Sequence, residues 1–219
     1  MTPPDAPLIP GLLSGEERVE LATGAVVLRG FAEDAAETLL AEVDRITAQA
    51  PFRHLETPGG KRMSVAMTNC GTLGWVSDRR GYRYEGRDPL TGKPWPEMPE
   101  SFRRLAADAA AAAGFPGFAP EACLINCYVP GTRLTLHQDR DERNYDHPIV
   151  SVSLGLPATF QFGGPRRGDP ARRVALYHGD VVVWGGPSRL YHHGVLPVGE
   201  GMHPATGGRR INLTLRRAA

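Results

Sequence analysis

Two short segments of this chain carry side chains that could bind a metal ion together. Residues 133–139 read RLTLHQD, and the alternation of polar and apolar residues predicts a strand. In a regular strand Thr135, His137 and Asp139 share one face, and the two leucines lie on the other. An imidazole and a carboxylate on one face are two ligands of the 2-His-1-carboxylate facial triad, which binds iron(II) and leaves positions open for a cosubstrate and O2.

A third ligand for such a triad is available in residues 191–194, which read YHHG. If this segment is extended, His192 and His193 point to opposite faces, so only one of them can reach the metal. We choose His193, which directly precedes Gly194. The alternative for either histidine is a buried, hydrogen-bonded side chain without a metal, and a His-x-Asp pair also occurs by chance.

The last strand-like segment places two arginines on one face. Its sequence RRINLTLRR puts Ile211, Leu213 and Leu215 on one side and Arg210, Asn212, Thr214 and Arg216 on the other. The second face could be a solvated surface, but inside a barrel the arginines would need anionic partners. A small dicarboxylate meets that need, because a guanidinium grips a carboxylate in a planar fork. We expect 2-oxoglutarate there, with Asn126 and Tyr128 adding an amide and a hydroxyl.

A basic and aromatic region, residues 57–98, lies between two predicted helices. Up to Trp95 it contains seven basic residues against three acidic ones, although the whole chain has 25 Lys plus Arg, 24 Asp plus Glu and a net charge of +1. Trp75, Tyr82 and Tyr84 offer ring faces on which bases can stack, while the basic side chains hold phosphates. The alternative is a solvated loop with buried aromatic residues.

Strands in the second half of the chain must position these groups. Short runs with period-two alternation, separated by Gly, Pro and Asp, are typical there of a sandwich or barrel. We predict an all-β core of the jelly-roll type over residues 120–217, with helices packed outside it, which makes the fold class α+β. One helix is expected from Ala35, with Asp34 as its N-cap, and another from Pro99 to Gly114.

Length and composition favour one domain, residues 1–219, with a loose arm over residues 1–15. The three cysteines, Cys70, Cys123 and Cys127, are expected to be buried thiols rather than metal ligands. The odd cysteine count, the lack of a signal-peptide core and the lack of a long apolar run predict a soluble, cytoplasmic protein that does not bind membranes. Nothing in the sequence indicates an obligate interface, so we expect a monomer.

From about Gly24 onward the chain resembles the AlkB-type nucleic-acid dealkylating dioxygenases. The motifs that carry the resemblance are TPGG, MSVAMTNCG, LGW, DPLTGKPWPEMP, LINCYVPG, LHQDRDE, IVSVSLGLPATFQFGG, HGDVVVWGG, SRL and NLT. The resemblance implies a double-stranded β-helix topped by a nucleotide-recognition lid over residues 57–98. It also implies that iron(II) is held by His137, Asp139 and His193, and 2-oxoglutarate by Asn126, Tyr128, Arg210, Asn212 and Arg216. Cys127 departs from the motif, which often has arginine there.

The resemblance also implies a substrate and a reaction. The implied contacts to a flipped nucleotide are Met67, Trp75, Tyr82, Asp141 and Arg167. With O2 as the second cosubstrate, the enzyme would demethylate 1-methyladenine or 3-methylcytosine in single- or double-stranded DNA, or in RNA, releasing formaldehyde, succinate and CO2. The target methyl lies on the Watson–Crick edge, so the base must be flipped out or already single-stranded.

Three alternatives remain open at this point. A dioxygenase of the same barrel class could act on RNA or on protein, although the aromatic, basic lid disfavours protein. A cupin-like metal-binding module without oxygenase activity would have no affinity for 2-oxoglutarate and would leave Arg210 and Arg216 without a role. A structural nucleic-acid-binding barrel would make the pattern of metal ligands a coincidence.

Overall fold

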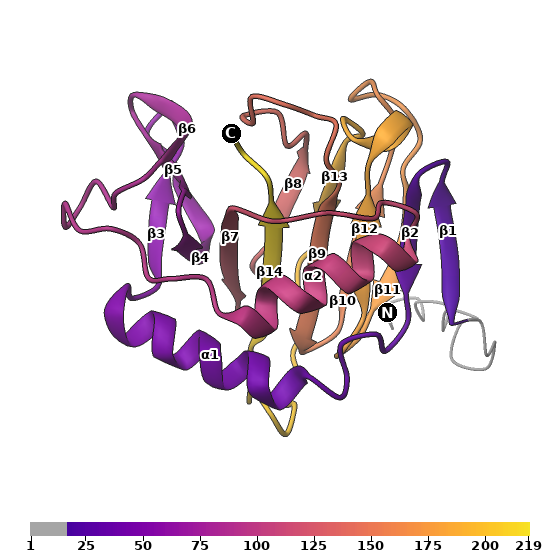
Figure 1. The fold of residues 1–219 in the computed structure, drawn as a ribbon, viewed down its shortest axis with the longest axis horizontal. Coiled ribbons are helices and arrows are strands. Elements are labelled where there is room, and N and C mark those ends of the chain that lie inside the picture. Colours follow the sequence, from indigo (N-terminus) through magenta and orange to yellow (C-terminus); the bar gives the residue numbers. More distant parts are fainter. Residues whose placement is uncertain (1–16) are drawn as a thin grey trace, which may run out of the picture.

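Two β-sheets and two helices form most of this protein (Figure 1). The computed structural model describes residues 17–219, so the predicted arm at residues 1–15 lies outside the described part. The larger sheet has the strand order β1 (Arg18–Ala22), β2 (Ala25–Leu28), β12 (Val181–Trp184), β9 (Ile149–Gly155), β14 (Arg210–Arg216), β7 (Ala122–Tyr128), β4 (Arg62–Gly71) and β3 (Arg53–Glu56). The smaller sheet has the order β11 (Arg172–Leu176), β10 (Ala158–Phe162), β13 (His193–Val195) and β8 (Leu134–His137).

The helices α1 (Ala36–Gln49) and α2 (Glu100–Ala112) pack on the outer face of the larger sheet, and a short 3-10 turn occupies Gly186–Ser188. Figure 1 shows α2 crossing in front of β14, β9 and β12, with α1 running below it. Their buried residues recur at helical spacing, namely Leu39, Val43 and Ile46 in α1 and Phe102, Ala106 and Ala109 in α2. The apolar stripe of each helix therefore covers the sheet.

The predicted N-cap of the first helix is wrong. Ala35 occupies the N-cap position of α1, and no side chain caps the helix. A backbone turn precedes the helix instead, because Glu33 N–H donates to Gly30 O and Ala36 N–H donates to Glu33 O. These bonds satisfy part of what a side-chain cap such as Asp34 would have supplied.

The two faces of the larger sheet differ in chemistry, as the alternation in the last strand predicted. Ile211, Leu213 and Leu215 of β14 pack with the helices. The alternate residues Arg210, Asn212, Thr214 and Arg216 face the space between the sheets, and each is no more than 6% exposed. The arginines therefore lie inside the barrel and not on a solvated surface.

The three cysteines lie in the core of the protein. Cys70, Cys123 and Cys127 are buried free thiols that pack on the helix side of the larger sheet, as predicted. Within residues 17–219 no helix is long and apolar enough to cross a bilayer.

Region 57–98 contains more regular structure than its sequence suggested. Residues 62–71 form β4, which pairs with β7 on one side and β3 on the other. The strands β5 (Gly74–Asp78) and β6 (Gly81–Glu85) form a hairpin that belongs to neither large sheet. In Figure 1 this hairpin stands at the upper end of the molecule, where β14 also leads to the C-terminus.

Candidate metal and cosubstrate site

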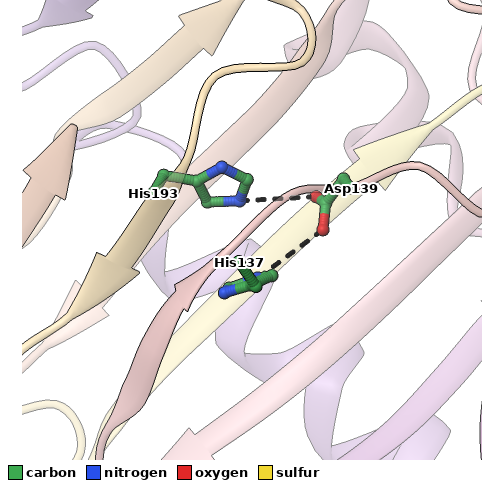
Figure 2. A group of neighbouring side chains, drawn as sticks. All are labelled: His137, Asp139 and His193. Carbon is green, nitrogen blue, oxygen red and sulfur yellow. Dashed lines mark ion pairs between the residues drawn. The ribbon is translucent and has the colours of Figure 1, made fainter. Parts of the chain in front are cut away.

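Two histidines and one aspartate come together where β8 and β13 meet (Figure 2). The possible ligand atoms of His137, Asp139 and His193 all lie within 4.8 Å of one another. His137 Nε2 is 3.6 Å from Asp139 Oδ1, and His193 Nε2 is 3.7 Å from Asp139 Oδ2. Two imidazoles and a carboxylate that converge in this way match the donor set of a facial triad.

A β-bulge in β8 aims His137 inward. His193 pairs with His137 and Val195 pairs with Leu134, so two residues of β8 face a single residue of β13. Leu134 and His137 consequently share the inner face, and the strict alternation predicted for residues 133–139 is wrong at this point. Gly194 is required there, because a Cβ would lie 2.7 Å from the carbonyl oxygen of Leu134.

Backbone carbonyls orient both imidazoles. His137 Nδ1 lies 2.8 Å from Thr135 O and His193 Nδ1 lies 3.0 Å from Tyr191 O, so each Nδ1–H donates and each Nε2 is left with its lone pair toward Asp139. Burial, reinforced by the neighbouring His193, lowers the pKa of His137 to about 4. The neutral ring is the form that binds a metal at pH 7.

His192 does not join this group. Its Nδ1 lies 3.2 Å from Gly164 O, on the loop that follows β10. Among residues 17–219, the side chains that converge as possible metal ligands include His193 and Asp139 and do not include His192. The geometry thus favours His193 over His192 as the metal ligand from the YHHG motif.

Arg216 divides the two oxygens of Asp139 between two tasks. Its Nη2 and Nε donate to Asp139 Oδ2 at 2.6 and 3.1 Å. Oδ1 accepts no hydrogen bond from Arg216 and lies 3.6 Å from His137 Nε2. Burial alone would raise the pKa of Asp139, but Arg216, followed by His193, holds that pKa well below its usual range. The carboxylate therefore stays ionised, as a metal ligand must.

Arg210 is a buried cation with unused donors. It is 1% exposed, and its Nη2 donates to Ser153 Oγ at 3.0 Å. Its guanidinium also lies 4.8 Å from the ring centroid of Tyr128. Nε and Nη1 find no partner among the described residues. Burial lowers the pKa of Arg210, and an unpaired buried guanidinium is costly, so an anion is the expected partner.

Amide and hydroxyl groups adjoin the arginine. Strand pairing places Asn212 opposite Asn126 and Arg210 opposite Tyr128. Asn126 Nδ2 donates to Asn212 Oδ1 at 3.3 Å, and Asn212 Nδ2 donates to Ser151 Oγ at 2.8 Å. Asn126 Oδ1 has no partner among the described residues. The residues predicted to hold 2-oxoglutarate therefore line one buried strip across β7 and β14.

The aromatic residues of the hairpin have different surroundings. Trp75 and Tyr82 stack with ring centroids 5.6 Å apart, and Tyr82 is 46% exposed. Trp75 Nε1 donates to Asp141 Oδ2 at 2.8 Å, two residues after Asp139. Tyr84 instead points to the barrel, where its hydroxyl donates to Glu142 at 2.7 Å. Burial raises the pKa of the Tyr84 phenol well above its usual value, so it remains a donor.

Two predicted substrate residues lie outside this aromatic pair. Met67 is 3% exposed and packs in the core between the sheets. Arg167 is exposed and lines, with Arg133 and Gln161, a cavity of about 300 Å³. Sequence reasoning missed Glu142 and Arg189, which are buried beside Asp139 and form an ion pair. Their only signal was an acidic residue in HQDRDE and an arginine in SRL.

Comparison with known proteins agrees with this geometry. A family model described as the 2OG-Fe(II) oxygenase superfamily matches residues 24–216. The alpha-ketoglutarate-dependent dioxygenase AlkB of Salmonella typhimurium is 60% identical over 91% of this chain and 92% of its own length. The chain belongs to the AlkB family. The nucleic acid dioxygenase ALKBH1 of Mus musculus is more distant, at 32% identity over 56% of this chain and 31% of its own length. The solved structure of OsALKBH1 superposes with a TM-score of 0.82, at 29% identity, and covers 91% of this chain and 99% of that one.

As a member of the AlkB family, the chain is an iron(II)- and 2-oxoglutarate-dependent dioxygenase with a jelly-roll fold. The alternative of a metal-binding module without oxygenase activity is thereby set aside, as is a structural barrel. The residues present fit both groups that the family uses. The unpaired Nε and Nη1 of Arg210 suit a carboxylate, and the His-Asp-His set suits iron(II).

Proposed function

We propose that this dioxygenase removes alkyl groups from the bases of damaged DNA. The observation that carries the proposal is the stacked pair of Trp75 and Tyr82, which is hydrogen-bonded through Trp75 to Asp141, two residues from Asp139 of the His-Asp-His group. An aromatic platform so close to an oxidising centre suits a planar substrate. The names of the relatives AlkB and nucleic acid dioxygenase ALKBH1 support a nucleic-acid base as that substrate.

His137, Asp139 and His193 would hold iron(II), with Oδ1 of Asp139 as the carboxylate donor. For 2-oxoglutarate, the unpaired donors of Arg210 would bind a carboxylate, with further contacts from Asn126, Tyr128, Asn212 and Arg216. When both groups and O2 are bound, the centre supplies an oxidation that hydroxylates an N-methyl group while 2-oxoglutarate becomes succinate and CO2. The hydroxymethyl product loses formaldehyde and leaves the repaired base.

Region 57–98 would act as the nucleotide-recognition lid. A flipped base would stack on Trp75 or Tyr82, and the basic side chains of the lid would contact the phosphates. Asp141 would favour 1-methyladenine and 3-methylcytosine because their methylated rings are cationic. Met67 and Tyr84 would shape the site from the barrel side, and Arg167 would contact the strand from its exposed position.

We further propose that the protein acts as a cytoplasmic monomer of one domain, residues 1–219, with the catalytic core over residues 120–217. Alkylated single- or double-stranded DNA would be its partner, and RNA remains the second candidate of the same reaction class.

The test is to incubate the protein with iron(II), ascorbate, 2-oxoglutarate and an oligonucleotide that carries one 3-methylcytosine. We expect the oligonucleotide to lose the mass of one methylene group, with one succinate formed for each methyl lost. An RNA oligonucleotide of the same sequence is the matched comparison, and faster loss from RNA would reverse the preference. An unchanged mass in both oligonucleotides would contradict the proposal.

A further inference from the structure

Asp139 belongs to a buried cluster of four charged side chains. Its members are Asp139, Glu142, Arg189 and Arg216, and the side chain of each is at most 10% exposed. Two carboxylates and two guanidinium groups give formal charges that cancel. Buried charges are stable only when they are paired and hydrogen-bonded, so this balance is a requirement of the fold.

Glu142, like its partner Arg189, belongs to none of the predicted ligand sets. Its Oε1 accepts a hydrogen bond from Tyr84 and lies 3.5 Å from Arg216 Nε. Its Oε2 forms an ion pair with Arg189 Nη2 at 3.2 Å and accepts no hydrogen bond from any residue within 17–219. The single carboxylate therefore faces both arginines.

Arg189 connects its ion pair with Glu142 to the backbone of the metal-binding segment. Its Nη1 donates to Asp139 O at 2.8 Å, and its Nε donates to His147 O at 3.0 Å. Its guanidinium also lies 5.5 Å from the ring centroid of Tyr145. Arg189 thus holds the main chain of the residue whose side chain Arg216 holds.

The charge of Glu142 matters to a cation bound at Asp139. Without Glu142 the connected cluster would keep two guanidinium groups against one carboxylate. This excess positive charge would oppose a divalent ion and would favour an anionic cosubstrate. It would also leave Arg216 with Asp139 as its only carboxylate partner in the cluster.

We propose that Glu142, paired with Arg189, is a positioning residue that keeps the iron site electrostatically open to a cation. It holds Arg216 on Oδ2 of Asp139, leaves Oδ1 to the metal, and offsets the second guanidinium. The inference rests on the proposed ligand set of His137, Asp139 and His193, and it does not depend on which nucleic acid is the substrate.

The test compares metal and anion affinities in the Glu142→Gln variant, which keeps the shape and an acceptor oxygen but removes the charge. Mn2+ binding is measured by calorimetry, and binding of N-oxalylglycine, an inert analogue of 2-oxoglutarate, is measured at saturating Mn2+. Loss of one buried unit charge near a dication should weaken Mn2+ binding about tenfold. The affinity for N-oxalylglycine should stay unchanged or increase. A residue with a purely structural role would weaken both.

Asp180→Asn is the matched control. Asp180 is a buried carboxylate, 3% exposed, that accepts backbone hydrogen bonds from Gly30 and Tyr177. It lies away from the metal site, at the opposite end of β12 from Trp184, whose ring centroid is 4.7 Å from that of His193. This variant should lower the melting temperature and leave the Mn2+ affinity within twofold of the parent. Mn2+ affinity within twofold of the parent in Glu142→Gln would overturn the inference, and so would equal losses for Mn2+ and N-oxalylglycine.

If Glu142→Gln does not fold, the double variant Glu142→Gln, Arg189→Met is compared with Arg189→Met alone, because both lack the hydrogen bonds of Arg189 to Asp139 O and His147 O and differ only at Glu142. The Mn2+ affinity of the double variant should be about tenfold lower than that of Arg189→Met. Equal Mn2+ affinities in these two variants would contradict the charge-balance role. Failure of the proposed function can be told apart from failure of this inference. A parent protein that binds Mn2+ and N-oxalylglycine but leaves methylated oligonucleotides unchanged would contradict only the proposed substrate.

Discussion

The barrel interior and the β5–β6 hairpin hold their functional groups in different ways. Strands β7 and β14 are buried along their whole lengths and pair residue for residue with each other and with their neighbours β4 and β9 in the larger sheet. The hairpin belongs to neither sheet, and its two main connections to the site are side-chain hydrogen bonds from Trp75 and Tyr84. Chemistry is thus placed on rigid strands, and the proposed recognition surface on an element with few backbone ties.

The segment from Asp139 to Glu142 is where the two regions meet. The barrel holds it through Arg216 and Arg189, and the hairpin contacts it at Asp141 and Glu142. Variants in the barrel should therefore abolish metal or cosubstrate binding, whereas variants in the hairpin should change the use of substrate.

The largest effect is expected at His193, the first residue of β13, and its neighbour His192 provides the contrast. His193→Ala should abolish Mn2+ binding and succinate formation, because a facial triad cannot lose one of its three protein ligands. His192→Ala should retain most of both, since its ring bonds Gly164 instead of facing Asp139. Calorimetry and succinate release measure the two properties. The reverse ranking of these variants would reassign the ligand.

The next largest effect is expected at Arg210, whose guanidinium has two donors without partners among the described residues. Arg210→Ala should weaken binding of N-oxalylglycine by roughly 2 to 5 kcal/mol, the usual loss for a buried charge-assisted partner. Oligonucleotide affinity should change little, because Arg210 is 1% exposed and lies inside the barrel. Calorimetry on both ligands checks this expectation. An unchanged analogue affinity would place the anion site elsewhere.

The sequence predicted the barrel better than it predicted the details of the site. Period-two alternation correctly separated Ile211 from Arg210, because a strand flanked on both sides by other strands must follow its pleat. Alternation failed at Leu134, because a bulge is set by the partner strand and by Gly194, which a local pattern does not reveal. Asp34 was a plausible N-cap that a preceding backbone turn made unnecessary.

Buried charge partners were the least predictable part of the site. Glu142 and Arg189 are 47 residues apart in sequence and meet only because the chain folds back between β9 and β13. In contrast, His137 and Asp139 are adjacent in a motif, so their types and spacing suggested a shared task. Long-range ion pairs carry no local signal of that kind.

A smaller effect, confined to substrate, is expected from the hairpin. Trp75→Ala and Tyr82→Ala should each weaken oligonucleotide capture by roughly 1 to 3 kcal/mol, the usual value of one base–aromatic stack. Succinate formed in the absence of oligonucleotide should stay at the parent level, because neither ring contributes to the His-Asp-His group. Kinetics with and without a methylated oligonucleotide separate the two activities. A parallel fall in both would mean that these rings support the barrel, and the hairpin would no longer be a separate recognition element.

The smallest effect concerns the link between the regions, and it distinguishes the charge of Asp141 from the stacking of Trp75. Asp141→Asn keeps the shape of the side chain but removes its charge. It should raise the activation free energy for repair of cationic 3-methylcytosine by about 1 kcal/mol, the modest value of a partly exposed charge pair. Repair of the neutral adduct ethenoadenine should keep its rate. Trp75→Phe keeps a ring but removes the donor to Asp141 Oδ2, and it should slow repair of both lesions because the smaller ring stacks less well. The rate ratio of the two lesions, measured for each variant under single-turnover conditions, is the readout. If Trp75→Phe changes that ratio as much as Asp141→Asn does, the indole N–H sets lesion preference by orienting the carboxylate, and the hairpin controls selectivity as well as capture.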